Sequence, residues 1–128
     1  MSVPRKVVVD SNFLVSCLQF KIDIARELER LLDERYELVV SSRIVDELGM
    51  LAEGRTRSAG FARLALRFIR ERNVRVEKSD EHVDEWILNY ARENFALACT
   101  NDIALRWRLR KARVRTIIMK GKTHLDFY

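Results

Sequence analysis

The sequence predicts an α/β fold, a three-layer α/β/α sandwich around a central, mostly parallel sheet of five strands. Short apolar runs alternate along the chain with segments of helical character, which favours parallel strands joined by right-handed crossovers. Asp10 directly follows the apolar run 7–9, and Asp102 follows the run 96–99 after two further residues. Both acids are therefore expected where buried strands end, at the sheet edge where open α/β sheets bind their ligands.

The first half of the chain is expected to form two strands and four helices. The strands span residues 6–9 and 37–40, and the helices span 12–20, 23–34, about 42–52 and about 58–72. The second and fourth helices carry large apolar residues three and four positions apart, the spacing of one buried helical face. Ser41 or Ser42 offers a hydroxyl that can cap the third helix, and Gly54 and Gly60 indicate a loop within residues 49–60.

The second half continues the alternation. Strands are expected at residues 73–76, 95–99 and 115–119, and helices from about 80 to 94 and from 103 to 111. Ser79 is the expected cap of the first of these helices. We find no internal repeat, linker or low-complexity segment, so residues 1–128 are expected to form a single domain.

The composition is that of a globular protein. Apolar residues make up 48% and charged residues 34%, with one proline and four glycines. No apolar run approaches the roughly 18 residues that a membrane span needs, and the start lacks the apolar core of a signal peptide. The expected location is therefore the cytoplasm, away from membranes. Cys17 and Cys99 are too few and too far apart for a disulfide framework or a zinc site, so buried thiols are expected.

The net charge of +5 is unevenly distributed. No acid occurs between Asp102 and Asp126, whereas basic residues recur throughout that stretch: Arg106, Arg108, Arg110, Lys111, Arg113, Arg115, Lys120 and Lys122. A second basic group occupies the middle of the chain: Arg55, Arg57, Arg63, Arg67, Arg70 and Arg72. Any single arginine is as readily part of a solvated face. An acid-free block is better explained by contact with a polyanion such as nucleic acid.

Two further acids have unusual positions. Glu47 lies three residues after Ile44, which is expected to project it from the inward stripe of its helix. Asp84 lies three residues before Ile87, close to the buried face, although a first-turn acid stabilised by the helix dipole is an equal reading. Taken together with the two strand-end acids, they indicate a site that needs a counter-ion, most simply a divalent metal.

The order and spacing of four segments resemble the PIN domain, a nuclease fold. The segments are VVVDSNFL, SSRIVDEL, DEWILNYARE and ALACTND, followed by a basic helix and the strand RTIIM. The resemblance covers essentially the whole chain. Its ending, IIMKGKTHLDFY, looks most like stand-alone archaeal proteins related to the small-subunit processome nuclease, and somewhat less like VapC toxins.

This resemblance implies a set of functional residues. The acidic quartet that would hold one or two Mg²⁺ or Mn²⁺ ions corresponds to Asp10, Glu47, Asp84 and Asp102. The polar residues that would orient these carboxylates correspond to Ser11, Asn12 and Thr100. Asp46 is the competing choice for Glu47, but one residue along a helix turns it about a hundred degrees away. The resemblance also favours RNA over DNA as substrate and a homodimer as the assembly.

A metal held by hard oxygen ligands can activate water to attack a phosphodiester, which leaves a 5′ phosphate and a 3′ hydroxyl. Arg106, Arg110 and Arg113 are the expected phosphate track. His82 and His124 are expected to be surface or packing residues. Trp86 and Trp107 are expected to pack, although Trp107, between two arginines, can instead stack a base.

The chain is thus expected to be a metal-dependent ribonuclease that acts in rRNA processing or as a toxin. The rRNA-processing role implies a ribosomal assembly partner, and the toxin role implies an antitoxin. The alternatives are a structure-specific DNA nuclease and an RNA-binding assembly factor with a vestigial site. Dinucleotide binding is disfavoured because no glycine-rich turn follows the first strand. A phosphotransfer receiver is possible on fold alone, but it leaves the basic block unexplained.

Overall fold

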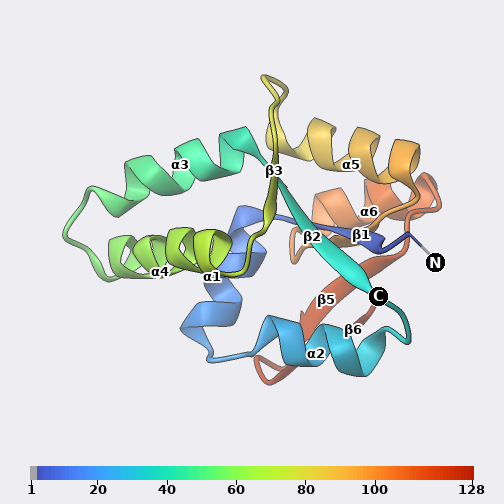
Figure 1. Ribbon diagram of the computed structural model, residues 1–128, viewed down its shortest axis with the longest axis horizontal. Helices are drawn as coiled ribbons and strands as arrows, with labels where there is room; N and C mark the ends of the chain where they lie inside the picture. Colours follow the sequence, from blue (N-terminus) through green and yellow to red (C-terminus); the bar gives the residue numbers. More distant parts are fainter. Residues whose placement is uncertain (1–2) are drawn as a thin grey trace.

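A mostly parallel sheet of six strands forms the centre of the protein (Figure 1). The structure is a computed structural model that describes residues 3–128. Across the sheet the strands follow the order β3-β2-β1-β4-β5-β6, and only β6 is antiparallel to its neighbour. Their bounds are β1 (Arg5–Val9), β2 (Tyr36–Ser41), β3 (Arg75–Glu77), β4 (Leu97–Cys99), β5 (Thr116–Lys120) and β6 (His124–Phe127).

Helices cover both faces of the sheet. Their bounds are α1 (Ser11–Gln19), α2 (Ile24–Leu31), α3 (Ser42–Ala52), α4 (Arg57–Glu71), α5 (Val83–Asn94) and α6 (Ile103–Lys111). Buried residues of α1 to α4 share one apolar core, and those of α5 and α6 share the other. No helix within residues 3–128 combines the length and the apolar character that crossing a membrane requires.

The central strand β1 contributes to both cores. Val7 and Val9 belong to the core beneath α1 to α4, whereas Val8 belongs to the core beneath α5 and α6. Because helices cover both faces of the sheet, the buried end of its central strand is apolar on both sides, as the three valines of β1 are. The predicted α/β sandwich with a mostly parallel sheet is confirmed.

The sequence did not predict the sixth strand. After β5, Gly121 and Lys122 take positive φ angles of 60° and 57°, and the chain turns back to pair with β5 in antiparallel register. Only Leu125 of this strand is buried in the core. Its four residues alternate between polar and apolar side chains, but so short a run is weak evidence for a strand, which is why the sheet was expected to have five strands.

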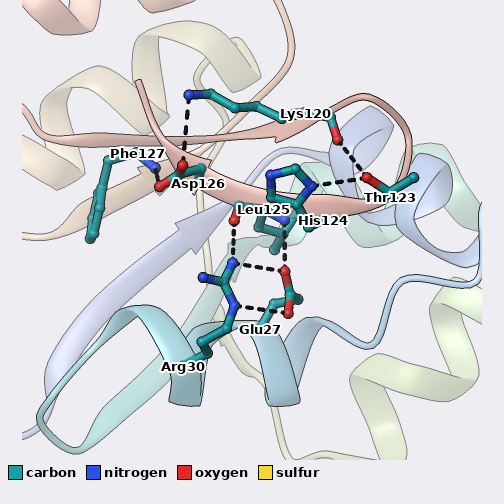
Figure 2. A network of polar contacts seen from close by, with 8 residues as sticks. All are labelled: Glu27, Arg30, Lys120, Thr123, His124, Leu125, Asp126 and Phe127. Carbon is teal, nitrogen blue, oxygen red and sulfur yellow. Dashed lines mark hydrogen bonds and ion pairs between the residues drawn. The ribbon is translucent and has the colours of Figure 1, made fainter.

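Strand β6 is attached to α2 by two charged side chains (Figure 2). The Glu27 carboxylate accepts a hydrogen bond from the Leu125 amide at 2.8 Å, and the Arg30 guanidinium donates to the Leu125 carbonyl at 2.6 Å. Glu27 and Arg30 also bind each other at 3.0 and 3.2 Å. The outer edge of β6 at Leu125 therefore has both backbone groups satisfied by side chains, which blocks edge-to-edge pairing there.

Two expected helix starts differ from the structure. Ser79 does not cap α5, because α5 begins four residues later and the Ser79 hydroxyl accepts instead from the Glu81 amide at 3.0 Å. Ser41 occupies the N-cap position of α3 without a side-chain cap. The Ser42 hydroxyl accepts from the Ser79 amide at 3.0 Å, so it ties the start of α3 to the loop that leads into α5.

Replacing Glu27 with alanine should lower the free energy of unfolding by roughly 1–2 kcal/mol. The reason is that the backbone amide of Leu125 loses its hydrogen-bond acceptor and the Arg30 guanidinium loses its ion-pair partner. Urea denaturation measures this loss. Glu29→Ala, an exposed glutamate on the same helix, is the matched control and should cost much less. Equal losses in the two variants would contradict the role given to Glu27.

Candidate functional site

A pocket with a volume of about 460 Å³ lies beside the carboxyl ends of β1 and β4. It gathers the four acids and two of the polar residues expected from the sequence: Asp10, Ser11, Asn12, Glu47, Asp84 and Asp102. Four further residues complete its lining: His82, Val83, Glu85 and Arg108. Residues from α1, α3, α5 and the start of α6 thus meet at one edge of the sheet.

Asp10 is the charged residue at the bottom of this site. Among residues 3–128 it is the one charged side chain that is buried, with 7% exposure. Its backbone amide donates to the Cys99 carbonyl at 3.0 Å, which holds the end of β1 against the end of β4. Burial raises the pKa of Asp10 to about 6, and the nearby carboxylates of Asp84 and Asp102 add to this rise.

The fully buried Thr100 hydroxyl links two of the acids. It donates to Oδ2 of Asp10 at 3.0 Å, an interaction that lowers the pKa of Asp10, and accepts from the Asp102 amide at 3.1 Å. Oδ1 of Asp102 then accepts from the Leu105 amide at 2.9 Å and caps α6. One hydroxyl therefore fixes both the orientation of the Asp10 carboxylate and the backbone at the start of the helix.

Glu47 and Asp84 enter the pocket from its solvent side. Both were expected near the buried faces of their helices, but both are exposed, because α3 and α5 bury only the neighbouring stripe and leave these positions at the pocket rim. Partial burial raises the pKa of Asp84, the Asp102 charge raises it further, and Arg108 opposes both effects. Asp46, the competing choice for Glu47, is exposed and does not line the pocket.

The pocket carries an excess of negative charge. Arg108 donates to Glu85 at 2.6 Å, and within residues 3–128 none of the other four carboxylates forms an ion pair. Four acids without a basic partner beside a buried strand end repel one another and favour a bound cation.

The donor atoms suit Mg²⁺ or Mn²⁺. All four acids present hard carboxylate oxygens, which these ions prefer. In the described part of the chain, no three His, Cys, Asp or Glu side chains lie close enough together to form a closed metal cage. Mg²⁺ does not require such a cage, since it usually keeps several waters and binds one or two carboxylates together with substrate phosphates. The residues present therefore fit the open mode of binding.

The three arginines expected to track phosphate do not line the pocket. Arg106 and Arg110 place their guanidinium groups over the Tyr128 ring, at 4.7 and 5.4 Å from its centroid. Arg113 follows the end of α6 and lines a different hollow of about 370 Å³, beside the amino end of β4. The spacing of four residues does place Arg106 and Arg110 on one face of α6, but that face carries Tyr128 and does not line the pocket. Arg113 lies beyond the end of α6 with a positive φ of 61°, so it does not continue this face.

The sequence reasoning missed Arg108, Glu85 and His82 as pocket residues. His82 and Glu85 lie beside Asp84 in the sequence, and Arg108 is one of several arginines on the basic helix. Nothing in the sequence distinguished these three residues from their neighbours. Cys17 and Cys99 are buried free thiols, as expected. A larger hollow of about 610 Å³ lies between α2, β2 and α4, but its three glutamates, Glu29, Glu34 and Glu37, are mixed with Arg35 and Arg72.

Comparison with known proteins gives consistent matches over nearly the whole chain. Residues 7–122 match the family model described as PIN like domain. The chain is 32% identical over 127 residues to Ribonuclease VapC4 of Methanocaldococcus jannaschii, covering 96% of each. The structure described as that of the PIN domain endonuclease Utp24 superposes with a TM-score of 0.81 and 25% identity, covering 97% of this chain and 91% of that one.

A domain of a functionally unknown protein from Methanocaldococcus jannaschii also superposes, with a TM-score of 0.65 and 19% identity. The match covers 91% of this chain and 92% of that chain. At this level of identity the likeness shows the fold alone.

The raised pKa of Asp10 predicts a pH dependence of stability. A folded pKa of about 6 against an ordinary 3.8 means that the folded protein binds this proton more tightly than the unfolded chain does. The Asp10 contribution is therefore fully present below about pH 4, is lost as the pH rises through about 6, and amounts to about 3 kcal/mol.

Asp10→Asn removes this titration and is the variant to compare. In urea denaturation with a chelator present, the stability of the variant relative to the unmodified protein should rise between pH 4 and pH 7 by about 3 kcal/mol. A difference that stays constant over this range would contradict the burial and repulsion assigned to Asp10.

Proposed function

The chain belongs to the PIN-like domain family, and we propose that it is a metal-dependent ribonuclease. The observation that carries this proposal is the gathering of four carboxylates without basic partners around one pocket at the ends of β1 and β4. The match over 96% of Ribonuclease VapC4 and the likeness to the Utp24 endonuclease support RNA cleavage as the reaction. The proposed products carry a 5′ phosphate and a 3′ hydroxyl.

Asp10, Glu47, Asp84 and Asp102 are the acids proposed to surround Mg²⁺ or Mn²⁺, with one or two of them binding the ion directly and the others acting through its waters. When bound, such an ion supplies charge neutralisation at the phosphate and lowers the pKa of water at the site. The Thr100 hydroxyl holds Oδ2 of Asp10 in place, so the carboxylate is oriented before anything binds. Ser11 and Asn12, on the first turn of α1, line the same pocket and are proposed to orient ligands in the same way.

Hydrolysis replaces the bond between phosphorus and the 3′ oxygen with a bond from phosphorus to the oxygen of water. One proton leaves the attacking water, and one is taken up by the leaving 3′ oxygen. Because burial raises the pKa of Asp10 to about 6 in the absence of a cation, binding a cation there would release any proton that this carboxyl carries. Arg108 is the basic side chain in the lining, within reach of a phosphate once Glu85 releases it.

The biological role follows one of two lines. The likeness to Ribonuclease VapC4 favours a toxin with an antitoxin as partner, whereas the likeness to the Utp24 endonuclease favours rRNA processing with a ribosomal assembly partner. An antitoxin reading frame beside the gene separates the two. We propose a homodimer as the assembly in either case, which analytical ultracentrifugation measures.

Asp10→Asn and Glu47→Gln should each lower the rate of RNA cleavage, by at least roughly tenfold to a hundredfold, because each removes a formal charge from the metal site while keeping the side-chain shape. Single-turnover cleavage of a labelled single-stranded RNA with Mg²⁺ or Mn²⁺ measures the effect. Asp46→Asn is the matched control, since this exposed acid neighbours Glu47 but lies outside the pocket lining. Cleavage by Asp10→Asn at the unmodified rate would remove the acid quartet from the mechanism.

Mn²⁺ and Mg²⁺ should both raise the melting temperature, since an ion that binds the folded site and not the unfolded chain stabilises by about 2.7 kcal/mol at a hundred times its dissociation constant. Mn²⁺ should act at lower concentration. Glu47→Gln and Asp84→Asn should respond less, and Asp46→Asn should respond as the unmodified protein does. If neither ion changes the melting temperature, the result would favour the alternative of an RNA-binding assembly factor with an inactive site.

A further inference from the structure

Helix α6 exposes a large apolar face beside the acidic pocket. Ile103 is 64% exposed and Trp107 is 55% exposed, whereas Leu105 and Leu109 fill the core beneath the helix. Residues four apart lie one above the other on a helix, so Ile103 and Trp107 form one continuous strip. A single exposed apolar residue is ordinary, but here two large neighbours on a helix of nine residues are left largely uncovered by the rest of residues 3–128.

The position of this strip relative to the site is set by Asp102. That residue caps α6 and lines the acidic pocket, and Ile103 follows it directly. Trp107 therefore lies little more than one helical turn, about 7 Å along the axis, from the cap. The strip starts at the pocket rim and leads away from it.

Basic groups flank the strip on both sides. At about 100° per residue, Arg108 lies on one side of Trp107, toward the pocket that it lines, and Arg110 lies on the other. Beyond Arg110, the exposed ring of Tyr128 carries the guanidinium groups of Arg106 and Arg110 on its face. Across the surface of α6 the order is thus arginine, tryptophan, arginine, tyrosine.

Alternating aromatic and cationic groups suit a single nucleic acid strand. Bases stack on exposed aromatic rings and phosphates pair with arginines, and each stacked base contributes about 1–3 kcal/mol. Tryptophan, tyrosine and arginine are also enriched in protein interfaces, so the excess of positive charge on this surface is what favours a nucleic acid. Arg108 is paired with Glu85, but among residues 3–128 neither Arg106 nor Arg110 forms an ion pair, so their charges are available to a polyanion.

Resting on the ribonuclease function proposed above, we propose that Trp107, supported by Ile103, is the stacking platform for an unpaired nucleotide next to the scissile phosphate. A base can reach the indole ring only when it is not stacked inside a duplex. The platform therefore makes this protein select single-stranded over double-stranded RNA. Arg106 and Arg110 contact the phosphates that follow.

The test uses RNA binding without cleavage, in the Asp10→Asn background with a chelator present. The chain has two tryptophans, and Trp86 is buried with 6% exposure. Quenching of tryptophan fluorescence by bound RNA therefore reports on the exposed Trp107. A short single-stranded RNA should quench this signal. Trp107→Ala should weaken binding of that RNA by roughly tenfold or more, Trp107→Phe should restore most of it, and duplex affinity should not change.

Phe95→Ala is the matched control. Phe95 is an aromatic residue with 83% exposure that lines the arginine-rich hollow near Arg113, away from the acidic pocket. Its loss should leave single-strand binding unchanged. The salt dependence of binding should also stay the same in Trp107→Ala, since stacking removes no phosphate contact.

Unchanged single-strand affinity in Trp107→Ala would overturn the platform. So would an equal loss for single-stranded and duplex RNA, or a change from dimer to monomer with RNA affinity preserved, which would make the strip a protein interface. A different result would show that the ribonuclease proposal is wrong. If the unmodified protein never cleaves RNA with Mg²⁺ or Mn²⁺ but Trp107→Ala still loses single-strand binding, the platform stands and the cleavage reaction does not.

Discussion

The carboxylate of Asp10 is buried at the place where the two central strands end, and the geometry of the site follows from holding it there. A buried charge is unfavourable unless hydrogen bonds or opposite charges compensate it. Here the compensation is the Thr100 hydroxyl, which reaches across from the end of β4. The same hydroxyl accepts from the Asp102 amide, so the acid on β1 and the acid at the start of α6 are positioned by one side chain.

The remaining acids depend on how the helices are attached to the sheet. Glu47 reaches the pocket because α3 starts directly from β2, and Asp84 reaches it because α5 starts beside that point. The Ser42 hydroxyl connects these two starts through the backbone of Ser79, accepting at 3.0 Å and donating at 3.3 Å. The acidic pocket is thus assembled from the starts of α1, α5 and α6 and from the middle of α3, which explains why its residues are far apart in sequence.

Positive charge is distributed over the surface in separate groups. Arg108 faces the acids, Arg106 and Arg110 rest on Tyr128, and Arg113 lies in the hollow near the amino end of β4. The net charge of +5 is therefore not concentrated in one basic patch. The proposed RNA-binding surface and the proposed cation site are therefore neighbouring but distinct, and the exposed face of α6 joins them.

The sequence by itself determined the fold class and the order of the acids. Buried parallel strands are short apolar runs at any position in a chain, so the valines of β1 and the acid after them were readable without a structure. Only the tertiary structure decided what depends on contacts between distant segments. Strand β6 is held by Glu27 and Arg30 of α2, and the direction of each arginine on α6 depends on which side of the helix packs. The sequence pattern of one helix or strand indicates which of its residues are buried. The residues that contact an edge strand or a guanidinium come from distant segments, so they are known only from the packed structure.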